Sequence, residues 1–269
     1  MLNLILPLLL ALLGGAGGFF LRRWELATVF EESGLAALWS TPSLILMALS
    51  VVLAVAFALL CSKTKHKPAD YREAFCAQNN WVYLILMTLS AATMLFAGIL
   101  GLRYNGYCGI LCKLMNMMCL LSFVCVLAAA WTNFRGKPLR YSLPLLAPGY
   151  TLCLWLVSAY QQRAADPVVL DYVYELLAII CTLIGIYFSV GFSFGRPKIW
   201  RCAVFSLLGI YFSIVTLADA HSTADRLLFL FCILHQLASV SALLYHTFIA
   251  YTPTQPVELN NTQEVTPDE

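Results

Sequence analysis

The chain alternates long apolar runs with short polar connectors over almost its whole length. A helix of ~20 apolar residues crosses the ~30 Å hydrocarbon layer of a membrane, and each run is close to that length. The pattern therefore predicts an all-α fold, a polytopic transmembrane bundle of about eight helices. The predicted spans are Leu2 to Leu21, Pro42 to Cys61, Trp81 to Leu102, Cys112 to Trp131, Ser142 to Tyr160, Val168 to Phe192, Cys202 to Ala220 and Leu227 to Ala250.

The composition and length argue against any domain besides the membrane bundle. The chain is 61% hydrophobic and 11% charged, against roughly a quarter charged residues in soluble proteins. Eight spans leave little of the 269 residues for anything else, so we expect residues 1–250 to form a single membrane domain. Residues 251–269 are polar and contain several prolines, and we expect a disordered cytoplasmic tail there.

Basic residues in the connectors predict the orientation. The even-numbered connectors carry Lys63, Lys65, Lys67, Arg72, Arg135, Lys137, Arg140, Arg196, Lys198 and Arg201. The odd-numbered connectors carry Arg22, Arg23, Arg103, Lys113, Arg163 and Arg226. Because positive charge accumulates on the cytoplasmic side, the excess predicts a multi-pass cell-membrane protein with both termini in the cytoplasm. Arg22 and Arg23 directly follow the first span and alone would favour the opposite orientation.

The first connector, Arg22 to Pro42, has the pattern of a short amphipathic helix. From Arg23 to Ser33 its apolar and polar residues separate onto two helical faces, and Gly34 is suited to end such a helix. Tryptophans at both ends are typical of membrane interfaces. We expect an interfacial helix here, serving either as packing or as a lid over an outward cavity. The residues of the candidate lid are Trp24, Glu25, Glu31 and Glu32.

The sixth predicted span carries two acidic residues four positions apart, Asp171 and Glu175, which share one helical face. If the span begins at Val168, Glu175 lies ~10 Å inside the membrane. An ionised carboxylate at that depth is costly, so the side chain should face the bundle interior or water. Glu175 is therefore a candidate functional residue, and Asp171 is expected nearer the interface.

The eighth predicted span carries a polar stripe on an otherwise apolar helix. His235, Gln236 and Ser239 lie near its middle. Counted from Arg226, His235 is ~13 Å deep, close to the expected level of Glu175. An imidazole and a carboxyl group at one level can exchange protons or hold a polar ligand. The alternative is a structural histidine bonded to a neighbouring backbone carbonyl.

Polar residues also gather between the seventh and eighth spans. Asp219 and His221 end one span, and Asp225 and Arg226 begin the next. On the predicted orientation this group lies at the outer face above Glu175. It is either the mouth of a cavity or a solvated hairpin turn.

The first span also contains GGAGG, Gly14 to Gly18, with the GxxxG spacing that lets another helix backbone approach closely. Close helix packing is the expected role of these glycines. Four glycines in five residues also weaken a helix, so an unwound turn beside a cavity is the alternative.

No known catalytic or cofactor motif accompanies these polar residues. The chain has no HExxH, GxSxG or GxxxxGK[ST] sequence. Four histidines are not placed to ligate two haems, and Cys108 and Cys112 lack further ligands for a metal. We therefore expect no catalytic residue, metal or cofactor. A net charge of +2 without a basic patch argues against nucleic acid, which leaves the lipid bilayer as the expected partner.

These features predict binding or transport of a small solute or proton through an outward-facing polar cavity, with Glu175 and His235 as the titrating pair. One alternative is a membrane anchor subunit of a redox complex that binds a quinol through the same groups. Another is a structural or assembly protein, acting through a protein partner or a second copy of the chain. Residue types and spacing do not distinguish the three.

Overall fold

The computed structural model describes residues 2–29, 40–62, 67–104, 109–136, 143–163 and 172–249. Eight helices in these ranges are long and apolar enough to cross a membrane. The prediction of an all-α transmembrane bundle is confirmed. The elements are α1 (Leu2–Thr28), α2 (Thr41–Ser62), α3 (Tyr71–Phe75), α4 (Trp81–Tyr104), α5 (Ile110–Phe134), α6 (Leu143–Arg163), α7 (Val173–Gly191), η2 (Phe192–Phe194), α8 (Ile199–Thr216) and α9 (Thr223–Phe248).

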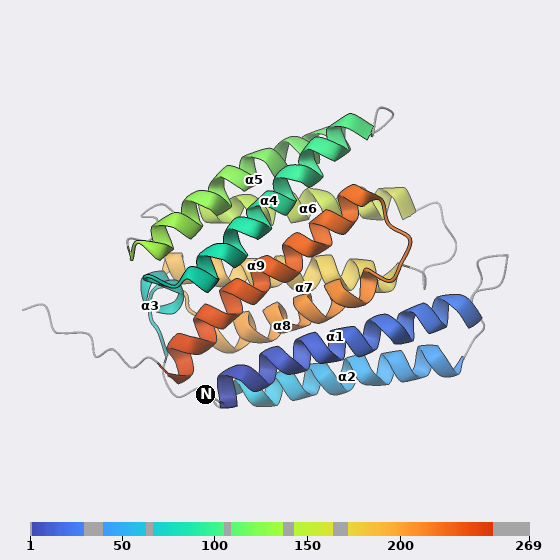
Figure 1. Ribbon diagram of the computed structural model, residues 1–269, viewed down its shortest axis with the longest axis horizontal. Helices are drawn as coiled ribbons and strands as arrows, with labels where there is room; N and C mark the ends of the chain where they lie inside the picture. Colours follow the sequence, from blue (N-terminus) through green and yellow to red (C-terminus); the bar gives the residue numbers. More distant parts are fainter. Residues whose placement is uncertain are drawn as a thin grey trace, which may run out of the picture.

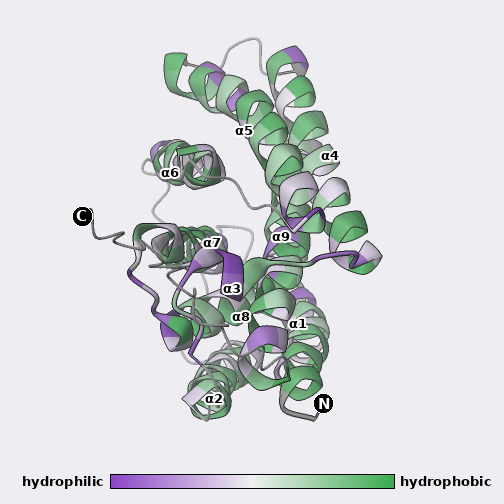
Figure 2. Cartoon of the chain, turned by 90° about the vertical axis from the view of Figure 1, so that its left-hand side faces the viewer, coloured by the Kyte–Doolittle hydropathy of each residue, from purple (hydrophilic) through white to green (hydrophobic). Residues whose placement is uncertain are grey.

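Five of the long helices form a closed ring, in which α9 contacts α4, α4 contacts α5, α5 contacts α6, α6 contacts α7, and α7 returns to α9. Helix α8 packs outside the ring against α7 and α9, and the α1 and α2 pair packs on α8 (Figure 1). Viewed from the end, α4, α5, α6, α7 and α9 surround a common centre (Figure 2). The ring is the part of the fold that positions the candidate site.

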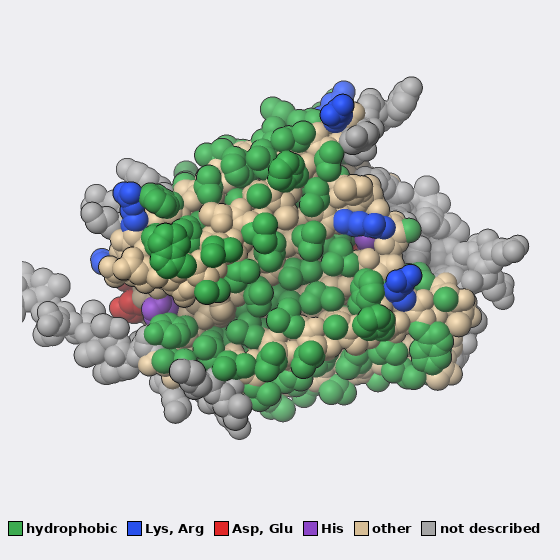
Figure 3. Space-filling model, in the orientation of Figure 1, with side chains coloured by type: hydrophobic (Ala, Val, Ile, Leu, Met, Phe, Trp, Pro, Cys, Tyr) green, Lys and Arg blue, Asp and Glu red, His purple; other side chains and the backbone are tan. Residues whose placement is uncertain are grey.

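The outer surface of the bundle is suited to lipid. Large apolar side chains are exposed on several helices, including Leu13, Phe20, Val52 and Val82. On the face shown in Figure 3, hydrophobic side chains cover the middle of the molecule, and the charged side chains lie toward its two ends. This arrangement matches the cross-section of a membrane, with an apolar band between two polar zones.

The glycines of α1 are positions of close helix packing, as their spacing predicts. A Cβ atom at Gly14 would lie 2.6 Å from Leu53 of α2, and one at Gly18 would lie 2.6 Å from Val215 of α8. Neither distance is compatible with a side chain unless the neighbour moves. The helix is unbroken through this stretch, so the alternative of an unwound turn is wrong.

Two differences between the predicted and the observed boundaries change the position of candidate residues. The residues from Arg23 that we expected in a separate interfacial helix continue α1 as far as Thr28. Of the polar side chains in this stretch, Glu25 is buried and paired inside the bundle, as shown below, whereas Arg23 and Thr28 are exposed. Helix α7 begins at Val173 rather than Val168, so Glu175 is in its first turn instead of deep in the span.

The connector between α2 and α4 folds into the bundle at one end, which we call the α3 end. Ala74, Phe75 and Ala77 are all buried, and the Phe75 ring meets Phe192 edge-on at 5.4 Å between centroids. Nε2 of His246 donates a hydrogen bond to the carbonyl oxygen of Cys76 at 2.7 Å. The short helix α3 is therefore held against the ring by both apolar packing and a hydrogen bond from α9.

Candidate functional site

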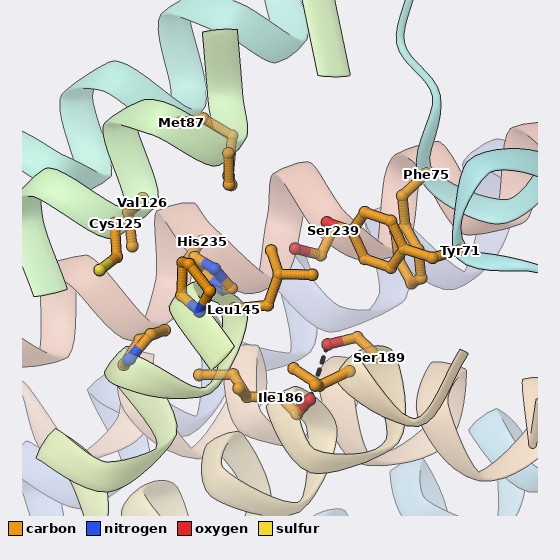
Figure 4. Close-up of a pocket in the computed structure, with 14 residues that line it drawn as sticks. Tyr71, Phe75, Met87, Cys125, Val126, Leu145, Ile186, Ser189, His235 and Ser239 are labelled. Atoms are coloured by element: carbon orange, nitrogen blue, oxygen red, sulfur yellow. Dashed lines mark hydrogen bonds between the residues drawn. The ribbon is translucent and has the colours of Figure 1, made fainter. Parts of the chain in front are cut away.

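A small cavity of about 30 Å³ lies inside the ring. All five ring helices contribute to its wall, and α3 covers its side toward the α3 end (Figure 4). Its polar side chains are those of His235 and Ser239 from α9 and Ser189 from α7. The wall is completed by Tyr71, Phe75, Met87, Cys125, Val126, Ala129, Pro144, Leu145, Pro148, Ile186 and Val190.

His235 is the one described histidine that lines this cavity. It lies ~18 Å along α9 from Thr223 at ~1.5 Å per residue, near the middle of the helix. The residue is only 7% exposed, and its Nδ1 atom has no hydrogen-bond partner among the described residues. A buried ring nitrogen without a partner is unusual, because leaving such a group unbonded costs about 1 to 3 kcal/mol. The arrangement is suited to an imidazole that binds water or a proton.

Aromatic residues of α3 close the cavity on one side. Tyr71 and Phe75 lie in contact, with ring centroids 4.9 Å apart, and both face the cavity. The side-chain amide of Asn133 donates to the hydroxyl oxygens of Tyr71 at 3.2 Å and Tyr83 at 2.9 Å. Burial raises the pKa of the Tyr71 phenol to about 12, so it stays protonated at neutral pH. This side of the cavity is closed by groups that do not ionise.

A second aromatic contact closes the ring on the opposite side. Trp155 of α6 is on the same face as the cavity-lining Pro148, two turns or ~10 Å further along the helix. Its ring packs against Phe229 of α9 with centroids 4.7 Å apart, and both residues are almost fully buried. The Trp155–Phe229 pair therefore lies on the opposite side of the cavity from the aromatic residues of α3, without being part of its wall.

Beyond this second layer lies a buried ionic cluster centred on Arg22, which is 0% exposed. We call this end of the bundle the Arg22 end. Nε of Arg22 donates to Asp219 and Nη1 donates to Glu25, each at 2.7 Å. The Ser43 hydroxyl of α2 donates to the second oxygen of Glu25. The guanidinium thus joins α1 to the connector between α8 and α9, and Glu25, which it binds, joins α1 to α2 through Ser43.

Further contacts connect this cluster to the ring. The guanidinium of Arg22 lies 5.2 Å from the centre of the Tyr174 ring of α7, a cation–π distance. Nε2 of His221 donates to the carbonyl oxygen of Thr216 at 2.9 Å and is 4.0 Å from Asp219. The His221 ring packs on Phe229 at 5.0 Å between centroids. The ionic cluster and the aromatic layer above the cavity are consequently in contact.

Burial raises the pKa of the Asp219 carboxyl above its ordinary value, against the opposing effect of the Arg22 guanidinium. The Thr216 hydroxyl also donates to this carboxyl, at 3.0 Å. Asp219 is thus easier to protonate than a solvated aspartate. The His221 ring lies beside it, with Nε2 4.0 Å from the Asp219 carboxyl.

The structure does not bring Glu175 and His235 together. The side-chain amide of Gln236 in α9 donates to the backbone carbonyl of Thr182 in α7 at 2.8 Å. This bond shows that Gln236 and Thr182 lie at the same level of the bundle. Glu175 precedes Thr182 by two turns, so it lies ~10 Å nearer the Arg22 end than His235. Glu175 is buried but is not part of the cavity wall. The expectation that the two share one level is wrong, because α7 begins later than its apolar pattern predicts.

The other candidate residues are placed as follows. Asp219 and His221 lie together in the Arg22 cluster, and Ser239 lines the cavity with His235. Gln236 instead bonds to α7, and Trp24 is half exposed on α1. Glu25 is not part of a lid, since it is buried beside Arg22. Asp171, Glu31 and Glu32 lie outside the described residues.

Arg22 is the functional candidate that the sequence pattern does not reveal. Its position directly after an apolar run is typical of a solvated charge at the end of a span. The available signal is the spacing of Arg22 and Glu25, which become neighbours if the first helix continues past Leu21.

Of the two cysteines considered for a metal site, Cys112 lies in the first turn of α5 and is disulfide-bonded. Cys108 lies outside the described residues.

Comparison with family models, with curated proteins and with solved structures gave no match at the level that would indicate relationship. The class of protein therefore follows from the fold. The chain is an integral membrane protein built from transmembrane helices. Among the described residues, its polar interior includes an ionic cluster at one end and a cavity that extends from His235 toward the α3 end.

Proposed function

We propose that this protein takes part in proton-linked transport, with His235 as the proton-binding group inside the five-helix ring. The observation that carries the proposal is the buried imidazole of a residue that lines the cavity inside the ring, with an Nδ1 that has no partner among the described residues. Ionisable groups in the middle of a membrane bundle are costly, and they mark ion or proton paths more often than structural positions. Histidine can bind or release a proton at a ring nitrogen, and it is one of the residues from which proton relays in membrane proteins are built.

The size of the cavity favours protons and water over larger ligands. One buried water needs about 10 to 15 Å³ of such space, so 30 Å³ accommodates about two waters. Pockets for small organic molecules are about 300 to 1,000 Å³. A quinol ring therefore has no room beside His235 in this conformation, which weighs against the redox-anchor alternative. The same comparison weighs against a bulky solute.

The two aromatic layers favour an occluded form of a transport pathway. Tyr71 and Phe75 line the cavity on the α3 side, and the Trp155–Phe229 pair lies between the cavity and the Arg22 cluster. Asp219, beyond the second layer, would supply protons when that layer opens. Transport would then require the two layers to open in turn, so that His235 is never open to both sides at once.

We further propose that the Arg22 end faces outward and that both termini are cytoplasmic. Ten basic residues in the even-numbered connectors against six in the odd-numbered ones support this orientation. The conflicting charge of Arg22 is neutralised within the bundle. The disulfide at Cys112 lies at the start of α5, which is an outer end in this orientation, and disulfides persist in oxidising compartments.

This orientation can be tested with reporters fused to the C-terminus. A fluorescent protein at that position is expected to fluoresce, and alkaline phosphatase is expected to be inactive, because only the second requires the oxidising side of the membrane. Active phosphatase together with absent fluorescence would reverse the proposed orientation.

The protonation of His235 can be followed directly by nuclear magnetic resonance. We expect the ring-nitrogen signals of His235, in bilayers and labelled with ¹⁵N, to move toward those of imidazolium as the pH is lowered and to return when it is raised. The signals are assigned by their loss in His235→Gln. A structural imidazole would keep unchanged signals over the pH range in which the protein stays folded, and that result would contradict the proposal.

A further inference from the structure

A second cavity, of about 350 Å³, lies between α6 and the end of α7. Its wall combines aromatic and apolar side chains with two basic ones, Arg196 and Lys198. The chain turns sharply here because Gly195 adopts the left-handed conformation, with φ of 66°. The backbone N–H of Arg196 then donates to the carbonyl oxygen of Gly191 at 3.0 Å. This turn places both basic residues beside the cavity.

The basic side chains at this cavity have no counter-charge in the described part of the chain. Arg196 and Lys198 are exposed, and neither forms an ion pair with a described acidic residue. Lys198 Nζ and Arg201 Cζ each lie 6.0 Å from the centre of the Phe188 ring, so a third cation is adjacent. None of the described residues that line the cavity is acidic. Its electrostatic field is therefore suited to an anion.

The remaining wall is suited to hydrocarbon. Tyr187 is 64% exposed and Phe194 is 58% exposed, and both project from the membrane-facing side of α7 and η2. Leu146 and Val190 extend the apolar surface toward α6. A site that is basic at one edge and open to lipid at the other matches a molecule with an anionic head and an apolar tail. A free anion would make no use of the apolar wall.

We propose that this cavity binds an anionic phospholipid, with the headgroup phosphate at Arg196 and Lys198 and the acyl chains against Tyr187 and Phe194. A volume of 350 Å³ falls within the range of about 300 to 1,000 Å³ found for small-molecule sites. Basic pockets between transmembrane helices near the interface are a recurrent setting for acidic headgroups. The site lies apart from the His235 cavity, since the two share only Val190 in their walls.

Lipid binding to the intact protein can be measured by native mass spectrometry during titration with phosphatidylglycerol or phosphatidylcholine. We expect phosphatidylglycerol to bind preferentially. The double variant Arg196→Gln/Lys198→Gln should bind it about 30-fold more weakly, or about 2 kcal/mol at 1.4 kcal/mol per tenfold change. The matched control is Arg23→Gln/Lys113→Gln, which removes two exposed basic residues away from the cavity. This control should bind as the unaltered chain does.

Three results would overturn the proposal. One is equal binding of both lipids, and another is an equal loss of affinity in the two double variants. The third is displacement of phosphatidylglycerol by inorganic phosphate at the same concentration, which would assign the site to a free anion. Retained α-helical circular dichroism in both double variants establishes that any loss is local.

Discussion

Replacing Arg22 with alanine is expected to destabilise the bundle by about 3 to 5 kcal/mol, the cost of leaving one side of a buried ion pair unbalanced. Arg22 is 0% exposed and donates to both Glu25 and Asp219. Without it, two carboxylates remain buried where water cannot solvate them. The measurement is the free energy of unfolding in mixed micelles of mild detergent and dodecyl sulfate.

The neighbouring residue provides the control for this prediction. Arg23 is exposed on the same helix, so Arg23→Ala should change stability by no more than about 0.5 kcal/mol. The triple variant Arg22→Met/Glu25→Gln/Asp219→Asn removes every charge of the cluster and should be more stable than Arg22→Ala alone. If Arg22→Ala and Arg23→Ala have equal effects, the ionic cluster does not hold α1 to the rest of the bundle.

Filling the central cavity is expected to stop proton movement without unfolding the protein. Ser239→Val replaces a hydroxyl with two methyl groups beside a space of only about 30 Å³. Little room for water then remains next to His235, and we expect proton flux into reconstituted vesicles to fall at least about tenfold, since a proton relay needs an unbroken chain of polar groups. The free energy of unfolding should be unchanged or slightly higher, as for other cavity-filling substitutions.

Ser241→Val is the matched control for this substitution. Ser241 is on the same helix and is partly buried, but its hydroxyl donates to the backbone carbonyl of Ala238 and does not line the cavity. Proton flux in Ser241→Val should equal that of the unaltered protein. Equal loss in both serine variants would indicate a general effect on α9, and unchanged flux in Ser239→Val would exclude the cavity as part of the proton path.

The hydrophobic pattern was sufficient to predict the spans, because membrane thickness and helix rise together determine the length of each apolar run. The glycines of α1 were equally informative, since small residues four apart have few roles other than close packing. His235 and Ser239 could be selected as a polar stripe on an apolar helix. The other residues of the cavity wall could not be predicted, because they depend on how five helices from distant parts of the sequence close into a ring.

The positions of the ionised groups were less predictable. A charged residue after an apolar run gives the same sequence pattern whether the helix ends there in water or continues inside the protein. Arg22 and Glu25 lie in a helix that continues. Asp219, which is 197 residues away from Arg22 in the chain, supplies the other half of the ion pair. The depth of Glu175 depends on the start of α7, and a shift of one or two turns moves the side chain by ~5 to 10 Å. Pairings of this kind come from tertiary packing.

Proton flux in vesicles containing His235→Gln tests the proposed role of this residue most directly. Glutamine keeps a polar side chain in the cavity but does not titrate, and Tyr245→Phe provides a control on the exposed side of α9. The measurement is the rate at which a trapped pH-sensitive dye responds to an imposed pH gradient, with the membrane potential held at zero by potassium and valinomycin. We predict flux in the unaltered chain and in Tyr245→Phe, and a response equal to that of protein-free vesicles in His235→Gln. Undiminished flux in His235→Gln would contradict a proton path through this histidine.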